Sequence, residues 1–199
     1  ADVVPQLVSC IRKLDWPASR LDVMFICEDA DVETRMALEA QTLGTAFRVI
    51  TVPAYGPQTK PRALRYALPL AKGEFVVVYD AEDQPHPGQL MEAFSVFQKE
   101  PVETACLQSP LSISNGASGC LTRMFAFEYG ALFSGLLPYL ARNARFLPLG
   151  GTSNHFRTCV LNDIGAWDPY NVTEDADLGT RLFRLGYRGK MLSLPSLED

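Results

Sequence analysis

Histidine is scarce in this chain, and the two that are present, His86 and His155, lie far apart in the sequence. Their scarcity disfavours a metal site built from imidazole ligands. The cysteines are dispersed and form no C-x-x-C pair; they are Cys10, Cys27, Cys106, Cys120 and Cys159. We therefore expect reduced cysteines in a cytosolic compartment, and neither a disulfide framework nor a zinc site.

Positive charge is also in short supply. The 199 residues carry 18 Lys and Arg against 23 Asp and Glu, a formal net charge of −5, and no basic patch is interleaved with aromatic residues. This balance argues against a nucleic-acid partner bound through its phosphates. No uninterrupted apolar run reaches membrane-spanning length. The remaining composition, 47% hydrophobic and 21% charged, is typical of a globular domain with a substantial core.

The two ends of the chain suggest a piece of a longer protein. The sequence begins at Ala1 without methionine and stops at Leu197-Glu198-Asp199 with no closing element. We expect a single domain over residues 1–199 that is truncated at both ends.

The stretch from Gly73 to Asp83 is the most informative part of the sequence. Its Val and aromatic residues, without polar alternation, predict a strand buried on both faces, and the run ends in Asp80, Glu82 and Asp83. In open α/β sheets ligands bind outside the carboxyl ends of such strands. Three acids within four residues repel one another, so a divalent cation that carries a phosphorylated ligand would explain them. A solvated acidic turn is the alternative.

The pattern of the remaining segments predicts an α/β fold. Helices are expected over 4–14, 32–43, 60–72, 87–99 and 174–185, and strands over 21–27, 47–52, 73–79, 105–113 and 190–194. Alternation of strand and helix is typical of a doubly wound, largely parallel sheet flanked by helices. Residues 121–140 are apolar but contain Arg123 and Glu128. They form either a core helix or an amphipathic helix that lies against a membrane or a partner.

Three further clusters of charge lie at predicted helix starts. Glu28-Asp29-Ala30-Asp31 and Thr173-Glu174-Asp175 are, taken alone, ordinary first-turn acids that complement the helix dipole. Lys60-Pro61-Arg62 is different, because cations at a helix N-terminus are mildly unfavourable. A bound anion such as a diphosphate would explain these cations.

The glycine pair Gly150-Gly151 costs conformational entropy after an extended Pro-Leu segment. It is explained where the backbone closely approaches a ligand or takes a positive φ. The side chains of Thr152, Ser153 and Asn154 could then bond sugar hydroxyls.

Taken in order, these motifs resemble family-two glycosyltransferases, in particular the membrane-embedded polysaccharide synthases related to cellulose synthase. The residues that carry the resemblance are Lys60-Pro61-Arg62-Ala63-Leu64, Asp80-Ala81-Glu82-Asp83, Gly150-Gly151-Thr152-Ser153-Asn154 and Thr173-Glu174-Asp175. The resemblance covers nearly the whole chain. It implies a Rossmann-like nucleotide-diphospho-sugar transferase fold with a mixed, mostly parallel sheet.

The resemblance also assigns the donor site. Asp29 falls where the family holds the base or ribose, and Lys60 where a basic residue meets the nucleotide and its phosphates. Asp80 would contact the nucleotide and, with Glu82 or Asp83, hold Mg²⁺ or Mn²⁺. This chain has D-x-E-D where many relatives have D-x-D, so the choice between Glu82 and Asp83 stays open.

On the acceptor side, the resemblance places the general base at Asp175, next to Glu174, and the acceptor-binding loop at Gly150, Gly151 and Thr152. Like charges should raise the pKa of Asp175 and the helix terminus should lower it. A single displacement by one activated hydroxyl would invert the anomeric centre. The expected donor is a nucleotide-diphosphate sugar, in the first place a UDP-sugar, and the acceptor a glycan.

The resemblance further implies transmembrane helices in the parent protein outside this chain, with residues 121–140 close to the membrane. It places the domain on the cytoplasmic face of the inner membrane and predicts that the fragment is soluble. Two alternatives remain. A sugar-1-phosphate nucleotidyltransferase would need a glycine-rich, arginine-containing opening loop, which is not visible, and a non-catalytic nucleotide- or glycan-binding module would retain only the fold.

Overall fold

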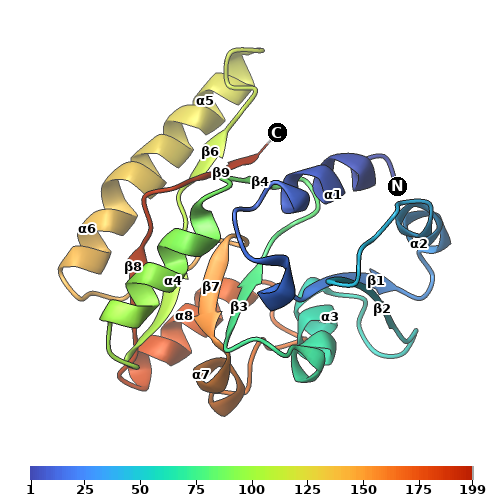
Figure 1. Cartoon of the computed structure of the whole chain (residues 1–199). Coiled ribbons are helices and arrows are strands. Elements are labelled where there is room, and N and C mark those ends of the chain that lie inside the picture. The colour runs from blue at the N-terminus through green and yellow to red at the C-terminus, as the bar shows by residue number, and fades with distance from the viewer. Residues whose placement is uncertain (199) are drawn as a thin grey trace.

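The computed structural model describes residues 1–198 and shows an α/β fold. The first part of the chain alternates helix and strand (Figure 1). Its elements are α1 (Val4–Arg12), β1 (Val23–Glu28), α2 (Val32–Glu39), β2 (Phe47–Val52), α3 (Lys60–Ala67), β3 (Phe75–Val78), β4 (Gln84–Pro85) and α4 (Gln89–Lys99). These bounds agree with the predicted helices and strands to within a few residues at most ends, and α3 is shorter because a 3₁₀ turn, Leu68–Leu70, follows it.

The second part of the chain is less regular. Its elements are β5 (Thr104–Gln108), β6 (Leu111–Ile113), α5 (Cys120–Tyr129), a π-helical segment (Gly130–Leu136), α6 (Leu137–Arg142), β7 (Asn154–Arg157), α7 (Thr158–Asp163), α8 (Glu174–Arg184), β8 (Arg188–Met191) and β9 (Ser196–Glu198). The strand expected over 105–113 is divided into β5 and β6, which belong to different sheets. Pro110, which has no N–H to donate, lies in the break.

The strands form three hydrogen-bonded groups, with the orders β1-β2, β3-β7-β5-β8 and β4-β9-β6. Pairing is parallel in β1–β2, β5–β8 and β6–β9 and antiparallel in β3–β7, β5–β7 and β4–β9. The sheets are therefore mixed, as the resemblance implies, and more residues pair in the parallel ladders than in the antiparallel ones. The strands β7 and β9, which the sequence pattern did not predict, supply the antiparallel pairs.

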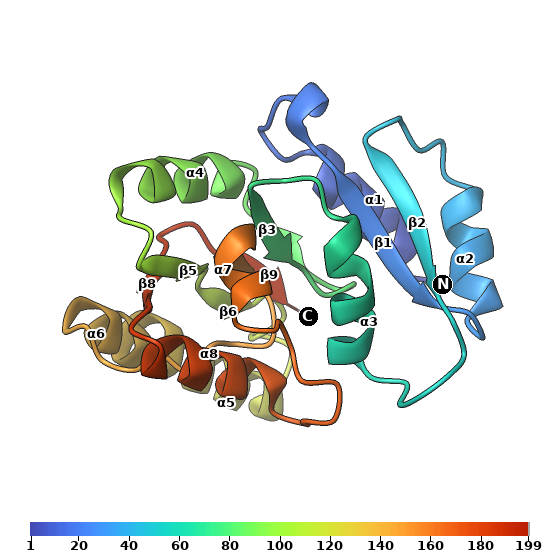
Figure 2. The same ribbon diagram turned by 90° about the horizontal axis from the view of Figure 1, so that it is seen from below.

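Helices cover the sheets on both faces (Figure 2). The main core lies under α6, α7 and α8, where Phe156 and Trp167 pack edge to face with ring centroids 5.8 Å apart. A separate core joins α1 and α2 to β1 through Val4, Val8 and Leu38. The two cores anchor the strands whose carboxyl ends carry the acidic motifs.

A buried polar network ties β9 to the central sheet. The Tyr79 hydroxyl donates to Gln89 Oε1 at 2.6 Å, and Gln89 Nε2 donates to Ser196 Oγ at 3.2 Å. Ser153 Oγ donates to Ser196 Oγ at 2.6 Å, and the His155 ring lies 3.2 Å from Gln89 Oε1. Burial lowers the pKa of His155 to about 3, so the network holds a neutral imidazole.

The segment Cys120–Arg142 is one long helix, interrupted by the π-helical residues, and most of it faces outward (Figure 1). Its exposed large apolar side chains are Leu121, Met124, Phe125, Phe127, Leu136 and Tyr139. By length and composition it could cross a membrane, with a mean hydropathy of 1.2 over its most apolar stretch, of which 11% is buried. Arg123 and Glu128 interrupt this apolar stretch, and most of its side chains are not buried, so of the two predicted forms the structure does not favour a core helix.

Gly179 in α8 tests the packing that holds the acidic start of this helix. A Cβ at Gly179 would lie 2.8 Å from the backbone oxygen of Leu147, which cannot move without moving the segment before Gly150. We expect Gly179→Ala to lower the free energy of unfolding by about 1–3 kcal/mol, although alanine favours a helix. Gly130→Ala, where a Cβ would meet nothing within 4 Å, is the control and should be neutral or stabilising by up to about 1 kcal/mol. Urea denaturation measures both, and equal stability of the two variants would contradict the packing argument.

Candidate active site

Lys60 lies where three of the predicted motifs meet. It is the first residue of α3, and its Nζ lies 2.5 Å from Asp80 Oδ1 and donates a hydrogen bond to the carbonyl oxygen of Gly151. Asp80 is the second residue after the end of β3, and Gly151 belongs to the loop before β7. The basic motif, the acidic motif and the glycine motif are therefore in contact, although the sequence separates them by up to 91 residues.

Asp175 lies on the other side of Gly151. A Cβ on Gly151 would lie 3.7 Å from Asp175 Oδ2, an ordinary van der Waals contact, so Gly151 and this carboxylate are direct neighbours. Asp175 belongs to the first turn of α8, and its Oδ1 accepts a hydrogen bond of 3.3 Å from Trp167 Nε1. Asp80 and Asp175 thus share one site, with Lys60 and Gly151 between them.

The environment of Asp175 raises its pKa to about 7. Burial is the largest cause; the charges of Glu174 and Asp80 raise the pKa further, whereas Lys60 and the Trp167 hydrogen bond lower it. The sequence left the balance between like charges and the helix terminus open. In the structure the dominant influence is burial, which disfavours the carboxylate form.

A clamp beneath the acidic turn holds Asp80 in place. The Asp80 N–H donates to Asp83 Oδ2 at 2.8 Å and to Thr152 Oγ1 at 3.0 Å, and the Thr152 hydroxyl donates to Asp83 Oδ2. Asp83 is 1% exposed, and its Oδ1 has no hydrogen-bond partner. Burial raises its pKa to about 7 against the lowering effect of these hydrogen bonds. Glu82, by contrast, is exposed.

The loop 150–154 differs from the expectation in two ways. Positive φ occurs at Ser153 (57°) and not at Gly150 or Gly151. At Gly150 a Cβ would lie 3.1 Å from the Phe133 ring and 3.3 Å from Gln108 Oε1, so a larger residue there would force these side chains to shift. The Thr152, Ser153 and Asn154 side chains are at most 3% exposed and hydrogen-bond internally, so they do not face an acceptor from the surface; Gly151 is the exposed residue of the loop.

Two of the predicted residues lie apart from this cluster. Asp29, after β1, is 3.7 Å from Arg35 Nη1, and its carbonyl oxygen accepts a hydrogen bond from the same side chain. Arg62, two residues after Lys60, is 8% exposed and lies 3.3 Å from Glu28, with its guanidinium over the Tyr55 ring. Arg62 therefore fastens the loop after β2 to the end of β1, whereas Lys60 remains beside Asp80.

Sequence reasoning missed three residues that shape the site. Trp167 orients Asp175, and Arg181 holds the preceding loop by donating to the carbonyl oxygens of Ile164 and Ala166 at 2.8 and 2.6 Å. Glu198, on β9, accepts a hydrogen bond from Tyr129, and the charges of Asp80 and Glu82 raise its pKa further beyond the effect of burial. Trp167 and Arg181 lie within eight residues of Asp175 but belong to none of the motifs, and Glu198 is brought near only by the fold.

Comparison with known proteins decides the family. The profile of the family described as "Glycosyltransferase like family 2" matches residues 2–196. The chain belongs to this family.

Relatives of known sequence agree with this family. Glucomannan 4-beta-mannosyltransferase 2 of Arabidopsis thaliana is 25% identical over 192 residues, which cover 93% of this chain and 35% of the relative. Beta-monoglucosyldiacylglycerol synthase of Trichormus variabilis is 24% identical over 200 residues, which cover 99% of this chain and 42% of the relative. The chain thus spans about two fifths or less of the length of these two relatives.

Solved structures share the fold. The mannosyltransferase PcManGT of Pyrobaculum calidifontis, in complex with GDP-Man and Mn²⁺, superposes with a TM-score of 0.72 at 19% identity, covering all of this chain and 53% of that chain. TarS 1–349 of S. aureus in complex with UDP-GlcNAc gives a TM-score of 0.71 at 17% identity, and the match covers 98% of this chain and 55% of that chain. The glycosyltransferase fold implied by the motifs is confirmed.

The pKa of Asp175 predicts how stability depends on pH. Its ordinary value is 3.8, so between about pH 4 and pH 7 the folded chain keeps a proton that the unfolded chain releases. The protonated Asp175 therefore makes its full contribution to the free energy of unfolding below pH 4, and this contribution is lost as the pH rises through 7. Asp175→Asn removes the cost of ionisation, so we expect the variant to gain stability relative to wild type between pH 5 and pH 8.

Urea denaturation at the two pH values, with EDTA present, measures this effect. Asp163→Asn, at an exposed position in α7, is the matched control and should change stability equally at both pH values. If the Asp175→Asn difference is also the same at pH 5 and pH 8, the pKa of Asp175 is not raised by burial.

Proposed function

We propose that this chain is the catalytic domain of an inverting glycosyltransferase, which moves a sugar from a nucleotide-diphosphate sugar to a hydroxyl of a glycan. The observation that carries the proposal is the meeting of Asp80, Lys60, Gly151 and Asp175 in one site. Family membership supports the reaction class.

On the donor side, Asp80 and Lys60 would hold the nucleotide diphosphate. The ammonium group of Lys60 lies at the N-terminus of α3, where it can pair with phosphate oxygens in place of, or together with, the Asp80 carboxylate. Asp29, at the carboxyl end of β1, would contact the base or ribose. A UDP-sugar is the first candidate, and the named complexes of similar fold contain GDP-Man and UDP-GlcNAc.

The residues present fit a divalent cation that is shared with the diphosphate. Among residues 1–198 no group of three or more His, Cys, Asp or Glu side chains forms an all-protein metal site. Mg²⁺ is commonly held by one or two carboxylates together with substrate phosphates, and Asp80 and exposed Glu82 can supply these. Asp83 is better suited to hold the turn, because its Oδ2 already accepts from Asp80 and Thr152.

Bound there, Mg²⁺ or Mn²⁺ would offset the negative charge that grows on the departing diphosphate. Lys60 adds a second positive charge at the same place and would stabilise the same leaving group.

On the acceptor side, Asp175 would take the proton from the attacking hydroxyl. A pKa of about 7 places its proton affinity near the operating pH, which favours general base catalysis. Trp167 fixes the orientation of the carboxyl group, and Glu174 raises its proton affinity. Gly151 leaves room beside Oδ2 for the acceptor, with Gly150 and Thr152 shaping the loop from below. One displacement by one hydroxyl inverts the anomeric centre.

The exposed apolar face of Cys120–Arg142 would lie on the cytoplasmic side of a membrane in a longer protein. The exposed side chains of this face include Leu121, Phe125 and Phe127, and Arg142 and Arg145 lie at its end. Apolar residues beside basic ones are typical of interfacial helices on anionic lipid.

Calorimetry with UDP tests the donor site. We expect binding to the chain that is strengthened by Mn²⁺ and lost, by about tenfold or more in affinity, in Asp80→Ala. Asp163→Ala, exposed on α7, is the control and should bind as wild type does. Metal-independent binding that survives in Asp80→Ala would contradict the assignment, and a preference for nucleoside triphosphate would favour a nucleotidyltransferase.

Asp175→Asn in the longer protein tests the base. We expect transfer to fall by about 10²–10⁴-fold while donor binding stays unchanged, because the amide cannot accept the proton. The initial rate of sugar transfer and the dissociation constant for UDP measure the two effects separately. Wild-type turnover in this variant would exclude Asp175 as the base, and absence of turnover in the wild-type protein would favour a non-catalytic binding module.

A further inference from the structure

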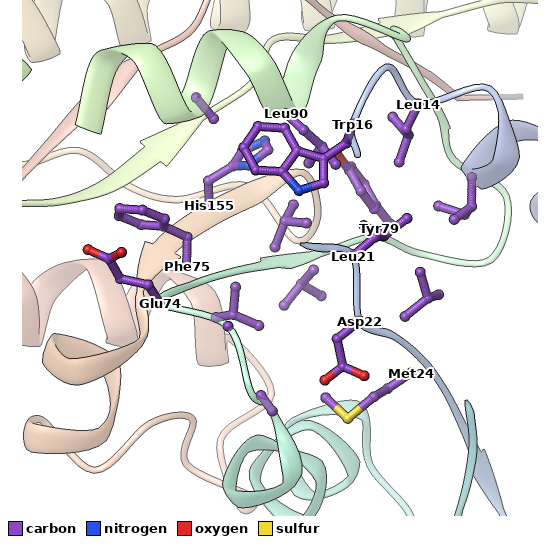
Figure 3. A pocket seen from close by; sticks show the side chains of 18 of the residues that line it. Leu14, Trp16, Leu21, Asp22, Met24, Glu74, Phe75, Tyr79, Leu90 and His155 are labelled. Carbon is purple, nitrogen blue, oxygen red and sulfur yellow. The ribbon is translucent and has the colours of Figure 1, made fainter. Parts of the chain in front are cut away.

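The largest cavity of the described chain is not part of the candidate site. It lies between β1 and β3, which no backbone ladder joins in the described sheets, and its volume is about 400 Å³ (Figure 3). Apolar strand residues, Val23–Ile26 and Phe75–Val78, line much of it. None of the four residues that meet in the candidate site lines it. Groups that could meet an acceptor at Asp175 are therefore to be found on the surface around the start of α8.

The loop 167–173, which leads into α8, is closed at its two ends. Trp167 is 2% exposed, and its Nε1 donates to Asp175 Oδ1 at 3.3 Å. This hydrogen bond joins the residue that begins the loop to the first turn of the helix that follows the loop. The loop therefore projects from a fixed base beside the proposed catalytic carboxylate.

The backbone of the loop is held by the loop's own polar side chains. Asp168 Oδ1 accepts from the Tyr170 N–H at 3.0 Å, and Asn171 Oδ1 accepts from the Thr173 N–H at 3.0 Å. The Asn171 N–H donates to the carbonyl oxygen of Asp168 at 3.2 Å. These hydrogen bonds form two successive turns, in which Asp and Asn side chains bond the backbone two residues further on.

The middle of the loop contacts the start of α3. Thr59, the residue before Lys60, donates from Oγ1 to the carbonyl oxygen of Pro169 at 2.9 Å. Figure 2 shows the segment before α8 beside the end of α3 at which this helix begins. The loop 167–173 thus lies next to both halves of the candidate site, with Asp175 just after it and Thr59 and Lys60 beside its middle.

Tyr170, at the tip of this loop, is 82% exposed, the highest value for a tyrosine in the described chain. Among residues 1–198 its ring stacks on no other ring or cation, and its hydroxyl has no hydrogen-bond partner. Tyr55 differs, because the Arg62 guanidinium lies 4.8 Å from the centre of its ring. Val172, two residues after Tyr170, is 94% exposed. The loop therefore presents an apolar and aromatic surface that nothing in the described chain covers.

A single exposed apolar side chain is ordinary on a protein surface, so the exposure of Tyr170 alone does not identify a binding site. Its position does. Tyr170 is five residues before Asp175, so their Cα atoms lie at most about 18 Å apart, and the two turns shorten this distance. A tyrosine on a firmly held loop supplies contact area at a low cost in conformational entropy. An extended ligand that reacts at Asp175 can therefore rest on Tyr170 further along its length.

The chemistry of the proposed reaction selects the kind of ligand. Inverting transfer from an α-linked nucleotide sugar produces a β-linked ring, so a growing acceptor would carry β-linked rings next to its reactive hydroxyl. A β-linked pyranose with equatorial substituents exposes C–H groups on its faces and hydroxyls at its rim. The ring of a tyrosine offers matching apolar area to such a face, and its hydroxyl is a polar partner for the rim.

We propose that Tyr170, with Val172 beside it, is an acceptor subsite that holds a β-linked hexopyranose ring of the glycan whose reactive hydroxyl lies at Asp175. The inference rests on the proposed function and names a part of the acceptor site that this function leaves open. Tyr170 would contact a ring that does not itself react. It would therefore strengthen acceptor binding and leave proton transfer to Asp175 unchanged.

NMR titration of the isotopically labelled chain with cellotetraose and with mannotetraose, both β-linked, in the presence of UDP and Mn²⁺, tests the subsite. We expect at least one tetraose to bind and to shift the ring resonances of Tyr170. Tyr170→Ala should raise its dissociation constant by about three- to tenfold, whereas Tyr170→Phe should bind nearly as wild type does, because the ring is kept. Tyr66→Ala, at an exposed position on α3, is the control and should leave binding unchanged.

In the longer protein the same variant separates an acceptor contact from damage to the base. We expect Tyr170→Ala to raise the KM for the accepted tetraose by about three- to tenfold and to leave kcat within about twofold of wild type. A fall in kcat at unchanged KM would mean that the substitution has displaced Asp175, and it overturns the subsite.

Absence of binding by both tetraoses, or equal affinity in wild type and Tyr170→Ala, overturns the subsite. A loss of UDP affinity in Tyr170→Ala, measured by calorimetry, also overturns it, since the ring would then belong to the donor site. Binding of dioctanoylglycerol but of neither tetraose, lost in Tyr170→Ala, would show a lipid acceptor instead. Tetraose binding that depends on Tyr170 in a chain that binds no UDP would overturn the proposed function and not the loop as a sugar-binding site.

Discussion

The charge of Lys60 is the constraint around which the site is built. Asp80, Asp175 and Glu198 come from three distant parts of the chain, and each is influenced by the same ammonium group. A cation at the start of a helix is unfavourable by itself, so the position of the Lys60 ammonium group depends on these carboxylates. The carboxylates in turn can lie close together because the ammonium group offsets their mutual repulsion. Under the proposed function, a bound anion and its counter-ion would replace the Lys60–Asp80 pair.

The support beneath the site is as important as the site itself. Asp83 and Thr152 hold the backbone of Asp80, while Trp167 holds Asp175, and none of these three side chains is more than 3% exposed. Because they are locked by burial and hydrogen bonds, the charged groups above them are positioned before any ligand arrives. The cost is visible in the raised pKa values of Asp83 and Asp175, which measure how much ionisation is disfavoured there.

The gap between β1 and β3 relates the fold to the site. The sheet elements on either side of it each carry part of the proposed donor site, with Asp29 on one and Asp80 on the other. They are held in register at the amino ends by Asp22 and at the carboxyl ends by α3. The two halves therefore keep a parallel arrangement even though no backbone ladder connects them.

Local patterns were sufficient for part of this protein. Apolar runs and capping residues predicted α1, β1, β2, α3, β3 and α4, because their period and their turn residues lie within a few positions of one another. The motifs around Lys60 and Asp80 were also visible, because a cation at a helix start and three neighbouring acids at a strand end conflict with local preference. Asp175 conforms to local preference, since acids are favourable in the first turn of a helix, and only the resemblance to the family singled it out. The order of the motifs carried the resemblance to the family, which the profile match confirmed.

Tertiary structure decided the rest. The strand β7 carries no alternating pattern that distinguishes it, and it forms because β3 and β5 offer edges on either side. Contacts between residues 69 to 72 positions apart in the sequence decide where two of the motif side chains point. They turn Asp83 toward the core and not toward a metal, and Thr152 toward the backbone and not toward an acceptor. The sequence by itself determined which residues carry charge and where strands end; only the folded chain decided which charges are buried, since burial is a property of packing and not of spacing.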